Sequence, residues 1–491
     1  MNLGILEGLS KNDRFKDECS RKAASWALAV GHDSKTPAST KIIRISLIPR
    51  TFKKDLYDKV VSLGPMFNKL VDNVSMDLDW LNHAHEGTVP ISTRFYSFLD
   101  VIHADGFIAR LIQAANSVYR GPRGKDISED IRLCLHRNDF MTTDGDSRIL
   151  QVEINTISVG FAGMIENLSV LHKSNRAQFY PDIKGTFPAG NPCSSFARAM
   201  SEAIEAHNSK WNRCGSTVLF VVEDGERNFV DQYALEYRLN HNHNISVLRR
   251  SLGELVDLVE FDSGRFLHVE GVEIPLVYFR SGYDPKHYPS EKEWDVRELI
   301  EKSISVKAPS ILAQLAGTKK VQQLWFRDNG QILHRFGLTS DEIKEVKSVF
   351  ALQCDPSVDT ETRQAAILTP EGWILKPQRE GGGHNLHGDD LREALSTMTS
   401  DELSQFVLME KMVPTPSPAL VIDGQATFDA GRIVPLIIPE AIGELGIFSY
   451  YIPQRNFNEV CGHLVRTKDK TTREGGVNIG HAFLDTVVLI E

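Results

Sequence analysis

The stretch Lys376-Pro-Gln-Arg-Glu-Gly-Gly-Gly-His-Asn385 decides the fold of this chain more than any other part of its sequence. It directly follows the apolar run 373–375, as expected of a β-strand that delivers a lysine and then a glycine loop. Glycines let backbone N–H groups approach phosphate oxygens, the lysine offsets their charge, and Glu380 can hold a cation that bridges the same oxygens. The stretch therefore predicts a site for a nucleotide and its metal, in preference to a plain surface turn.

The composition is that of a globular chain with more than one packed unit. The 491 residues are too many for one ordinary core, while 41% hydrophobic and 24% charged residues are typical of a folded protein. A net charge of -10 and the lack of any Lys/Arg-rich run predict no nucleic-acid partner. The six cysteines are scattered without a C-x-x-C pair, which favours reduced, structural thiols.

The sequence predicts no membrane segment, because no apolar run reaches 18 residues. The start at Met1 lacks a basic region followed by an apolar one, so we expect a cytoplasmic protein. A secreted form is the alternative if a signal peptide was removed before Met1, and the N-x-S sequons at Asn73, Asn167 and Asn244 would then matter.

The period of the apolar residues divides the first part of the chain. Residues 1 to about 125 are predicted to be helical, with a clear three- and four-residue spacing in 52–74. From 131 to 157 the period becomes two, which predicts a hairpin with its turn at 142–148. On its second strand Glu153 and Asn155 share a face, because side chains alternate along a strand. Two oxygen ligands at this spacing suit Mg²⁺, and the alternative is a solvated strand face.

Residues 217–316 alternate strands with helical stretches and predict a doubly wound α/β unit. We therefore expect an α/β protein with three parts: 1–216, containing the helical region and the hairpin, the substrate-binding unit 217–316, and the nucleotide-binding part 317–491.

Three features of the last part fit a nucleotide site. The apolar strand 406–410 can offer edge backbone groups to an adenine, with Met409 and Met412 packing on the base, although such methionines are also ordinary core residues. Arg466 and Lys468 alternate on one strand face and can meet phosphate or carboxylate, with an exposed basic strand as the alternative. The glycine-rich stretch 474–480 has the composition of a mobile flap.

Four motifs, in order along nearly the whole chain, resemble those of eukaryotic glutathione synthetases. They are Leu150-Gln-Val-Glu-Ile-Asn-Thr-Ile-Ser158, Leu315-Ala-Gly-Thr-Lys-Lys-Val-Gln-Gln323, Leu375-Lys-Pro-Gln-Arg-Glu-Gly-Gly-Gly383 and Leu464-Val-Arg-Thr-Lys468. The resemblance implies a circularly permuted ATP-grasp fold with an inserted substrate-binding domain and a lid. It also implies a homodimer that joins γ-glutamylcysteine to glycine, or a related amino acid, with ATP and two Mg²⁺ ions.

The resemblance implies a role for each matching residue. It implies metal binding for Glu153, Asn155 and Glu380. It implies nucleotide binding for Lys319, Lys376, Gly381, Gly382, Asn385, His387, Met409, Glu410, Met412, Glu444 and Lys468. It implies binding of the dipeptide or of the acceptor for Arg137, Ser158, Glu226, Asn228, Gln232, Arg280, Tyr283, Arg466, Val477 and Asn478. The direct catalytic contacts would come from Arg137, Lys319, Lys376 and Arg466.

Three positions depart from the family pattern. Gly160 stands where a serine is expected, Asn478 and Ile479 stand where small alanines are expected, and His387 replaces a tyrosine beside the nucleotide. Two hypotheses stay open. One is an ATP-dependent ligase that acts through an acyl phosphate, with an unchanged or shifted acceptor. The other is a diverged relative with little synthetase activity that keeps nucleotide binding for a regulatory or interaction role.

Overall fold

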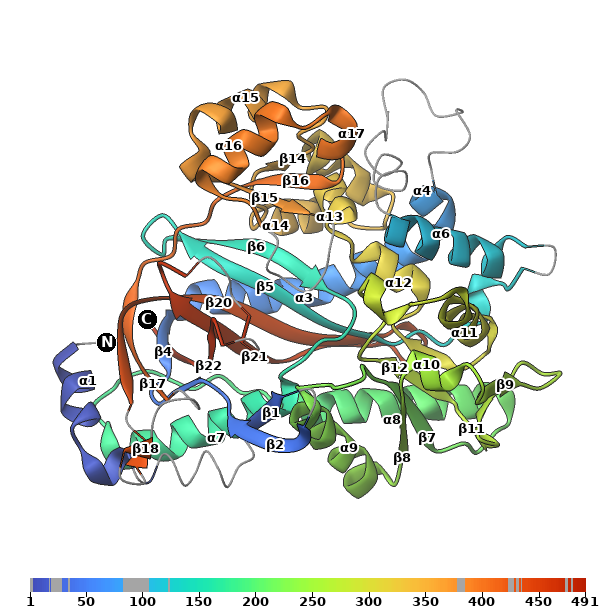
Figure 1. The fold of residues 1–491 in the computed structure, drawn as a ribbon, viewed down its shortest axis with the longest axis horizontal. Helices are drawn as coiled ribbons and strands as arrows, with labels where there is room; N and C mark the ends of the chain where they lie inside the picture. The colour runs from blue at the N-terminus through green and yellow to red at the C-terminus, as the bar shows by residue number, and fades with distance from the viewer. Residues whose placement is uncertain are drawn as a thin grey trace.

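A central sheet of seven strands organises the protein in the computed structural model (Figure 1). The structure describes residues 3–16, 18, 29–33, 36–82, 106–121, 124–377, 385–422, 428–429, 432–433, 435–472, 476–477 and 480–491. The strand order is β17-β3-β22-β21-β20-β5-β6, antiparallel except for the β22–β3 pair. The strands are β3 (Ile45–Ser46), β5 (Cys134–Thr143), β6 (Arg148–Asn155), β17 (Ser417–Ile422), β20 (Leu436–Ile452), β21 (Phe457–Asp469) and β22 (Phe483–Asp485).

Helices pack on both faces of this sheet. On one face, Leu445, Ile447 and Val465 join the apolar residues of α3 (Lys54–Ser75) in one core. On the other, Phe448 and Leu464 pack with α7 (Ala162–Phe179) and α8 (Pro192–Trp211). Neighbouring residues of β20 and β21 thus point to opposite faces, as the strand period requires. The helix predicted over 52–74 and the hairpin predicted over 131–157 are confirmed as α3 and as β5–β6.

The prediction of a purely helical start was wrong. Four strands precede α3: β1 (Ala29–Asp33), β2 (Thr36–Ile42), β3 and β4 (Arg50–Lys53). The buried residues Ile43, Ile45 and Leu47 alternate along the chain, and β3 and β4 pair in parallel with β22 and β23 (Val487–Ile490). These partners lie more than 430 residues away, so local periodicity gave no sign of them. The helices of this region are α1 (Leu3–Ser10), α3, α4 (Leu78–Asn82) and α6 (Gly106–Tyr119).

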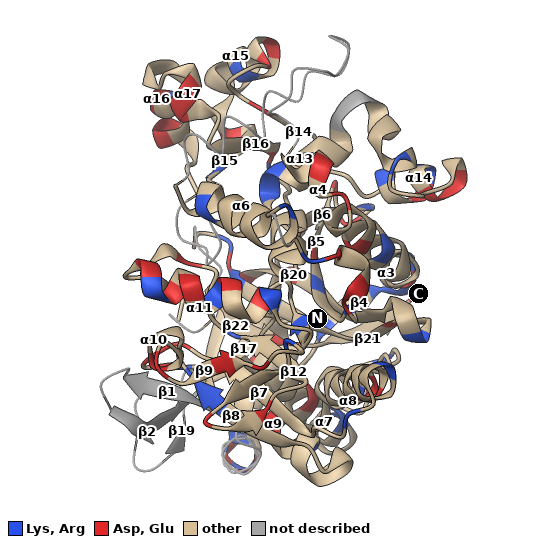
Figure 2. Ribbon diagram, turned by 90° about the vertical axis from the view of Figure 1, so that its right-hand side faces the viewer, with Lys and Arg blue, Asp and Glu red and all other residues tan. Residues whose placement is uncertain are grey.

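A second, four-stranded sheet is parallel throughout, in the order β13-β12-β7-β8. It confirms the α/β pattern predicted from 217 onward. The loops after β7 and β12 leave neighbouring strands at the point where the strand order reverses, which is where open α/β sheets bind ligands. Acidic and basic residues are interspersed along the helix α11 beside this sheet (Figure 2). The elements are β7 (Thr217–Val221), α9 (Phe229–His243), β8 (Ser246–Arg250), α10 (Leu252–Leu255), β9 (Val259–Phe261), β10 (Leu267–Val269), β11 (Val272–Glu273), β12 (Leu276–Phe279), α11 (Glu291–Lys302) and β13 (Val306–Ala308).

A small three-stranded sheet, ordered β14-β16-β15, carries the predicted lysine strand and has a core of its own. Two helices, α12 (Ile311–Ala316) and α13 (Lys319–Phe326), lead from the parallel sheet to this lobe, which lies at the top of Figure 1. Its elements are α14 (Ser340–Lys347), β14 (Gln353–Cys354), α15 (Thr360–Leu368), β15 (Trp373–Pro377), α16 (Gly388–Thr397), α17 (Ser400–Leu403) and β16 (Phe406–Glu410), and the short strands β18 (Phe428–Asp429) and β19 (Arg432–Ile433) form a separate pair. In the described part of the chain, no helix combines the length and the apolarity needed to cross a bilayer.

Candidate functional site

The centre of the site is a buried carboxylate, Asp139, on β5. Its two oxygens accept hydrogen bonds from Arg137 Nε at 2.7 Å and Arg137 Nη2 at 2.8 Å. The oxygen Oδ2 also accepts from Arg466 Nη2 and from Asn155 Nδ2, each at 2.8 Å. Asp139 is fully buried, and Gly446 on β20 lies opposite it. A Cβ at Gly446 would lie 2.7 Å from Asp139 Oδ1, so only glycine leaves room for this cluster.

The neighbouring strand β6 adds a second carboxylate, which faces two lysines. Lys319, the first residue of α13, places its Nζ 3.2 Å from Glu153 Oε2. Burial acts to raise the pKa of Glu153, but Lys319, Lys376 and Arg466 outweigh it and lower the pKa to about 2. Burial, aided by the charge of Lys319, lowers the pKa of Lys376. Two ammonium groups that face one carboxylate are better neutralised by an added anion, and a phosphate supplies such an anion.

Arg466 joins this cluster from β21. It pairs with Glu444, its direct cross-strand neighbour on β20, and with Asp139. The pKa of Arg466 lies above its ordinary value because Glu444 and Asp139 outweigh burial, so the guanidinium stays charged. Burial raises the pKa of Glu444, although Arg466 opposes this effect. Both predicted catalytic arginines therefore lean on Asp139.

The predicted metal ligands can be tested only in part. Glu153 and Asn155 lie on the same face of β6, with the Asn155 amide group donating to Asp139 so that its oxygen remains as the ligand atom. Glu380 lies outside the described residues. Within the described residues, no group of three His, Cys, Asp or Glu side chains is arranged to hold a metal. A carboxylate and an amide oxygen beside two phosphate-seeking lysines fit Mg²⁺, which takes few protein ligands and fills its shell with phosphate and water.

A second part of the site lies where the loop after β6 meets the parallel sheet. Ser158 has a φ of +53° and its Oγ donates to the Arg280 carbonyl at 2.9 Å. Asp231 of α9 accepts hydrogen bonds from the backbone N–H groups of Phe161, Gly163 and Met164, which fixes the loop at the start of α7. Gly160 lies against the pocket: a Cβ there would be 3.1 Å from both Arg280 Nη2 and Asn228 Nδ2.

Arg280 supplies the positive charge of this pocket. Its side chain is buried, and within the described part of the chain neither Nε nor Nη1 has a hydrogen-bond partner. The Asn228 Oδ1 atom is likewise buried without a partner among these residues. Because a buried donor or acceptor without a partner is costly, these atoms favour a ligand that carries both a carboxylate and a donor group.

Acidic and amide groups complete the pocket. Glu226 accepts from the Asn228 backbone N–H at 2.7 Å and from Gln232 Nε2 at 2.6 Å, and Arg249 Nη2 donates to Gln232 Oε1 at 2.5 Å. Burial, with the charges of Glu223 and Glu226, raises the pKa of Tyr283 to about 12, so its hydroxyl stays a donor. The structure thus brings together the residues predicted for the dipeptide on the loops after β6, β7 and β12.

The predicted nucleotide residues divide into described and undescribed ones. Met409 and Met412 are buried beside Leu150, and the Glu410 backbone N–H donates to the Leu352 carbonyl at 2.8 Å. Asn385 and His387 lie between β15 and α16, and Lys468 lies on β21 two residues after Arg466. Val477 is buried. Gly381, Gly382, Asn478 and Ile479 lie outside the described residues.

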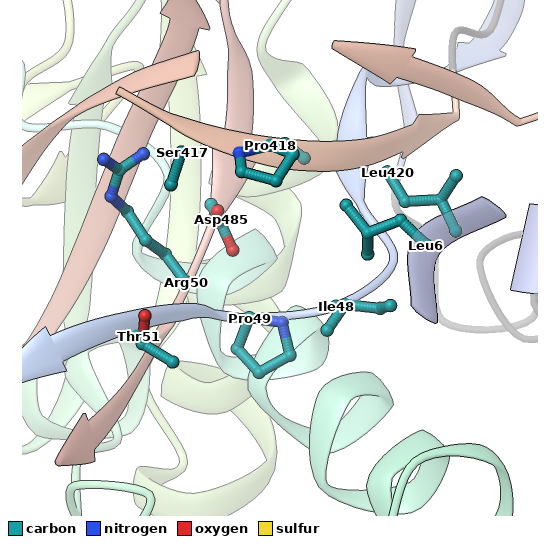
Figure 3. Close-up of a pocket in the computed structure, with 10 residues that line it drawn as sticks. Leu6, Ile48, Pro49, Arg50, Thr51, Ser417, Pro418, Leu420 and Asp485 are labelled. Carbon is teal, nitrogen blue, oxygen red and sulfur yellow. The ribbon is translucent and has the colours of Figure 1, made fainter. Parts of the chain in front are cut away.

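Figure 3 shows a small pocket between α1, β4 and β17 that none of the predicted site residues lines. Arg50 donates there to the carbonyls of Ala441 and Thr415, at 3.0 and 2.9 Å, and Asp485 accepts from Ser46 Oγ at 2.5 Å. Its polar groups thus serve the packing of the strands around it. The residues that line it are Leu6, Ile48, Pro49, Arg50, Thr51, Ser417, Pro418, Ala419, Leu420 and Asp485.

Two residues of the site were missed by the sequence interpretation. Asp139 shares the strand face of Arg137 in the same way that Asn155 shares that of Glu153, and the period of β5 offered this signal. Arg249 carried no comparable signal, because its contact with Gln232 depends on how β8 packs beside α9.

Comparison with known proteins agrees with the geometry. The family model described as eukaryotic glutathione synthase, ATP binding domain, matches residues 13–489. Glutathione synthetase of Homo sapiens is 33% identical over 493 residues, covering 96% of both chains. The chloroplastic glutathione synthetase of Solanum lycopersicum is 33% identical over 458 residues, covering 91% of this chain and 77% of the relative. The solved structure of a glutathione synthetase like-effector from Globodera pallida, in apoform, shares the fold with a TM-score of 0.74 at 17% identity, covering 98% of this chain and 99% of that one.

Proposed function

Because the chain belongs to the eukaryotic glutathione synthase family, whose members are ATP-dependent ligases that form C–N peptide bonds, we propose that it joins γ-glutamylcysteine to glycine or a related amino acid. The observation that carries this proposal is the cluster around Asp139, which holds Arg137 and Arg466 beside Glu153, Lys319 and Lys376.

The proposed reaction has two steps and needs no nucleophilic side chain. A carboxylate oxygen of the cysteinyl residue attacks the γ-phosphorus of ATP, and ADP leaves. The amine of the acceptor then attacks the acyl carbon, phosphate leaves, and the nitrogen loses a proton to water. Each step moves negative charge between oxygens, so its barrier is lowered by fixed cations rather than by acid or base groups.

Each residue of the cluster has a part in these steps. Lys319 and Lys376 would neutralise the phosphate oxygens, while Arg137 holds the reacting carboxylate and Arg466 that of the acceptor. Glu153 and Asn155, with Glu380, would hold Mg²⁺, which when bound offsets the charge of the triphosphate. Asp139 keeps the two arginines apart from these carboxylate oxygens and in fixed orientations.

The pocket around Arg280 would bind the γ-glutamyl end of the dipeptide. That end carries one carboxylate and one ammonium group. Arg280 offers N–H donors without partners among the described residues, and Glu226 and Asn228 offer oxygens close by. The remaining nucleotide contacts of the proposal are Gly381, Gly382, Asn385, His387, Met409, Glu410, Met412, Glu444 and Lys468, with Val477 and Asn478 beside the acceptor.

Several features of the family enter the proposal with the activity. They are a circularly permuted ATP-grasp core divided at about residues 216 and 316, two Mg²⁺ ions, a homodimer and a cytoplasmic location. Support for the unit 217–316 comes from its separate parallel sheet.

The test measures ADP release with ATP, Mg²⁺ and γ-glutamylcysteine, plus glycine, alanine, β-alanine or serine in turn, and identifies the product by mass. We expect dipeptide-dependent turnover with at least one acceptor. Lys376→Met should lower kcat about a hundredfold. Lys344→Met, at an exposed position on α14, is the matched control and should leave the rate unchanged. The ligase proposal fails if no acceptor gives dipeptide-dependent ADP.

A further inference from the structure

His287 lies just beyond the turn that carries Arg280 and Tyr283, and it closes that turn from inside. Its Nδ1 accepts hydrogen bonds from the backbone N–H groups of Gly282, at 3.1 Å, and Asp284, at 3.2 Å. The side chain is only 5% exposed. Because two N–H donors point at Nδ1, this nitrogen carries the lone pair and the ring proton sits on Nε2.

The protonated nitrogen of His287 faces the other loop of the pocket. Nε2 lies 3.5 Å from Glu223 Oε2, and Lys286 Nζ lies 2.6 Å from Glu223 Oε1. His287, against the effect of burial, and Lys286 hold the pKa of Glu223 at about 2, so this carboxylate stays charged. The imidazole therefore links the loop after β7, which leads to Glu226, with the turn after β12.

The ring also supports Tyr283 directly. The two rings meet edge to face, with centroids 4.8 Å apart. A side chain confined in this way keeps its hydroxyl in one place, which lowers the cost of ordering it when a ligand binds.

The rest of the turn is fixed without His287. The Gly282 carbonyl accepts from Tyr288 Oη at 3.2 Å and from Gln314 Nε2 at 3.0 Å. Gly282 itself has a φ of +92°, in the region that favours glycine. A variant of His287 should therefore fold, and what it loses is the precise placement of Tyr283 and of the adjacent Arg280.

We infer that His287 is a positioning residue for the dipeptide, a role that rests on the proposed ligase function. It acts through Tyr283 and Arg280 and touches neither ATP nor the reacting atoms. The affinity for γ-glutamylcysteine should therefore depend on His287, while the affinity for ATP should not.

The experiment compares His287→Leu with His287→Gln in the full-length protein. Leucine accepts no hydrogen bond, whereas a glutamine Oε1 can accept both N–H groups. We expect His287→Leu to raise the KM for γ-glutamylcysteine about tenfold, with kcat and the KM for ATP changing less than twofold. His287→Gln should restore most of the lost affinity. His268→Leu, at a half-buried histidine on β10, is the matched control.

A second measurement needs no substrate. Amide hydrogen exchange of peptides spanning 280–288 should be faster in His287→Leu than in the wild type, and β20 and β21 should be unchanged. Three results would each overturn the inference: unchanged exchange in this turn, equal rises of both KM values, or a glutamine variant as impaired as the leucine one. A wild-type protein that binds no dipeptide would refute the proposed function instead, and the exchange experiment would still decide whether His287 orders the turn.

Discussion

Replacing Asp139 by asparagine should weaken both the fold and the reaction, because this one carboxylate holds two arginines. It is fully buried and accepts four hydrogen bonds, two from Arg137 and one each from Arg466 and Asn155. Asparagine keeps one acceptor oxygen and replaces the other by an NH₂ donor. Whichever way the amide is turned, at least one guanidinium N–H then meets another donor.

The size of the effect follows from the burial of the pair. Removing one partner of a buried ion pair costs about 3–5 kcal/mol, because the other charge is left without compensation. An unfolding entropy of about 2.1 cal/mol/K per residue amounts to about 1 kcal/mol/K over the whole chain, so Tm should fall by about 3–5 °C. The rate should fall more steeply: with Arg137 and Arg466 no longer held, we expect a loss of about a hundredfold in kcat.

Calorimetry and the ADP-release assay measure the two effects. Asp144→Asn is the matched control, since Asp144 pairs with Arg148 at 3.0 Å on the surface, where both side chains are more than half exposed. Exposed ion pairs contribute at most about 1 kcal/mol, so the control should change Tm by about 1 °C or less. An Asp139→Asn protein with the Tm and kcat of the wild type would show that the arginines do not depend on this carboxylate.

Two further predictions concern single side chains. Burial raises the pKa of Asp485 to about 7, well above its unfolded value, so the neutral carboxyl stabilises the fold and the free energy of unfolding should fall as pH rises from about 4 to 7. Urea unfolding at pH 5 and pH 8 should show this fall in the wild type and a smaller one in Asp485→Asn; equal falls would contradict the assignment. Gly160→Ala should raise the KM for γ-glutamylcysteine several-fold, because its Cβ would crowd Arg280 and Asn228 at 3.1 Å, and Gly160→Ser should do so less, because its hydroxyl can accept from either group. A serine variant worse than the alanine one would refute that account.

Local patterns predicted those elements whose residues carry their own period. The helix α3, the hairpin β5–β6 and the parallel sheet were all visible as spacings of apolar residues. The strands β3 and β4 were not, because two to four residues are too few to show a period and their partners lie at the far end of the chain. Tertiary pairing decided their conformation against the expectation of helix.

The site was predicted unevenly for a related reason. Glu153 and Asn155 could be paired from the strand period alone, and motif likeness added residues such as Arg137 and Arg280. The dependence of Arg137 and Arg466 on Asp139 requires knowing that β5 and β21 flank β20, a fact of register that no local pattern contains. The placement of Glu380 beside Glu153 stays a prediction.

The position of β22 has a consequence for how the enzyme comes into being on the ribosome. This three-residue strand lies between β3 and β21, so the sheet that bears Arg466 is completed only when residues 483–485 have emerged and met a partner made at the very beginning of synthesis. Nascent chains must therefore wait, with the edges of β3 and β21 unpaired, through translation of almost the entire message. Such a delay exposes strand edges to wrong partners, and it suggests why chaperone supply could limit the yield of this protein in a foreign host.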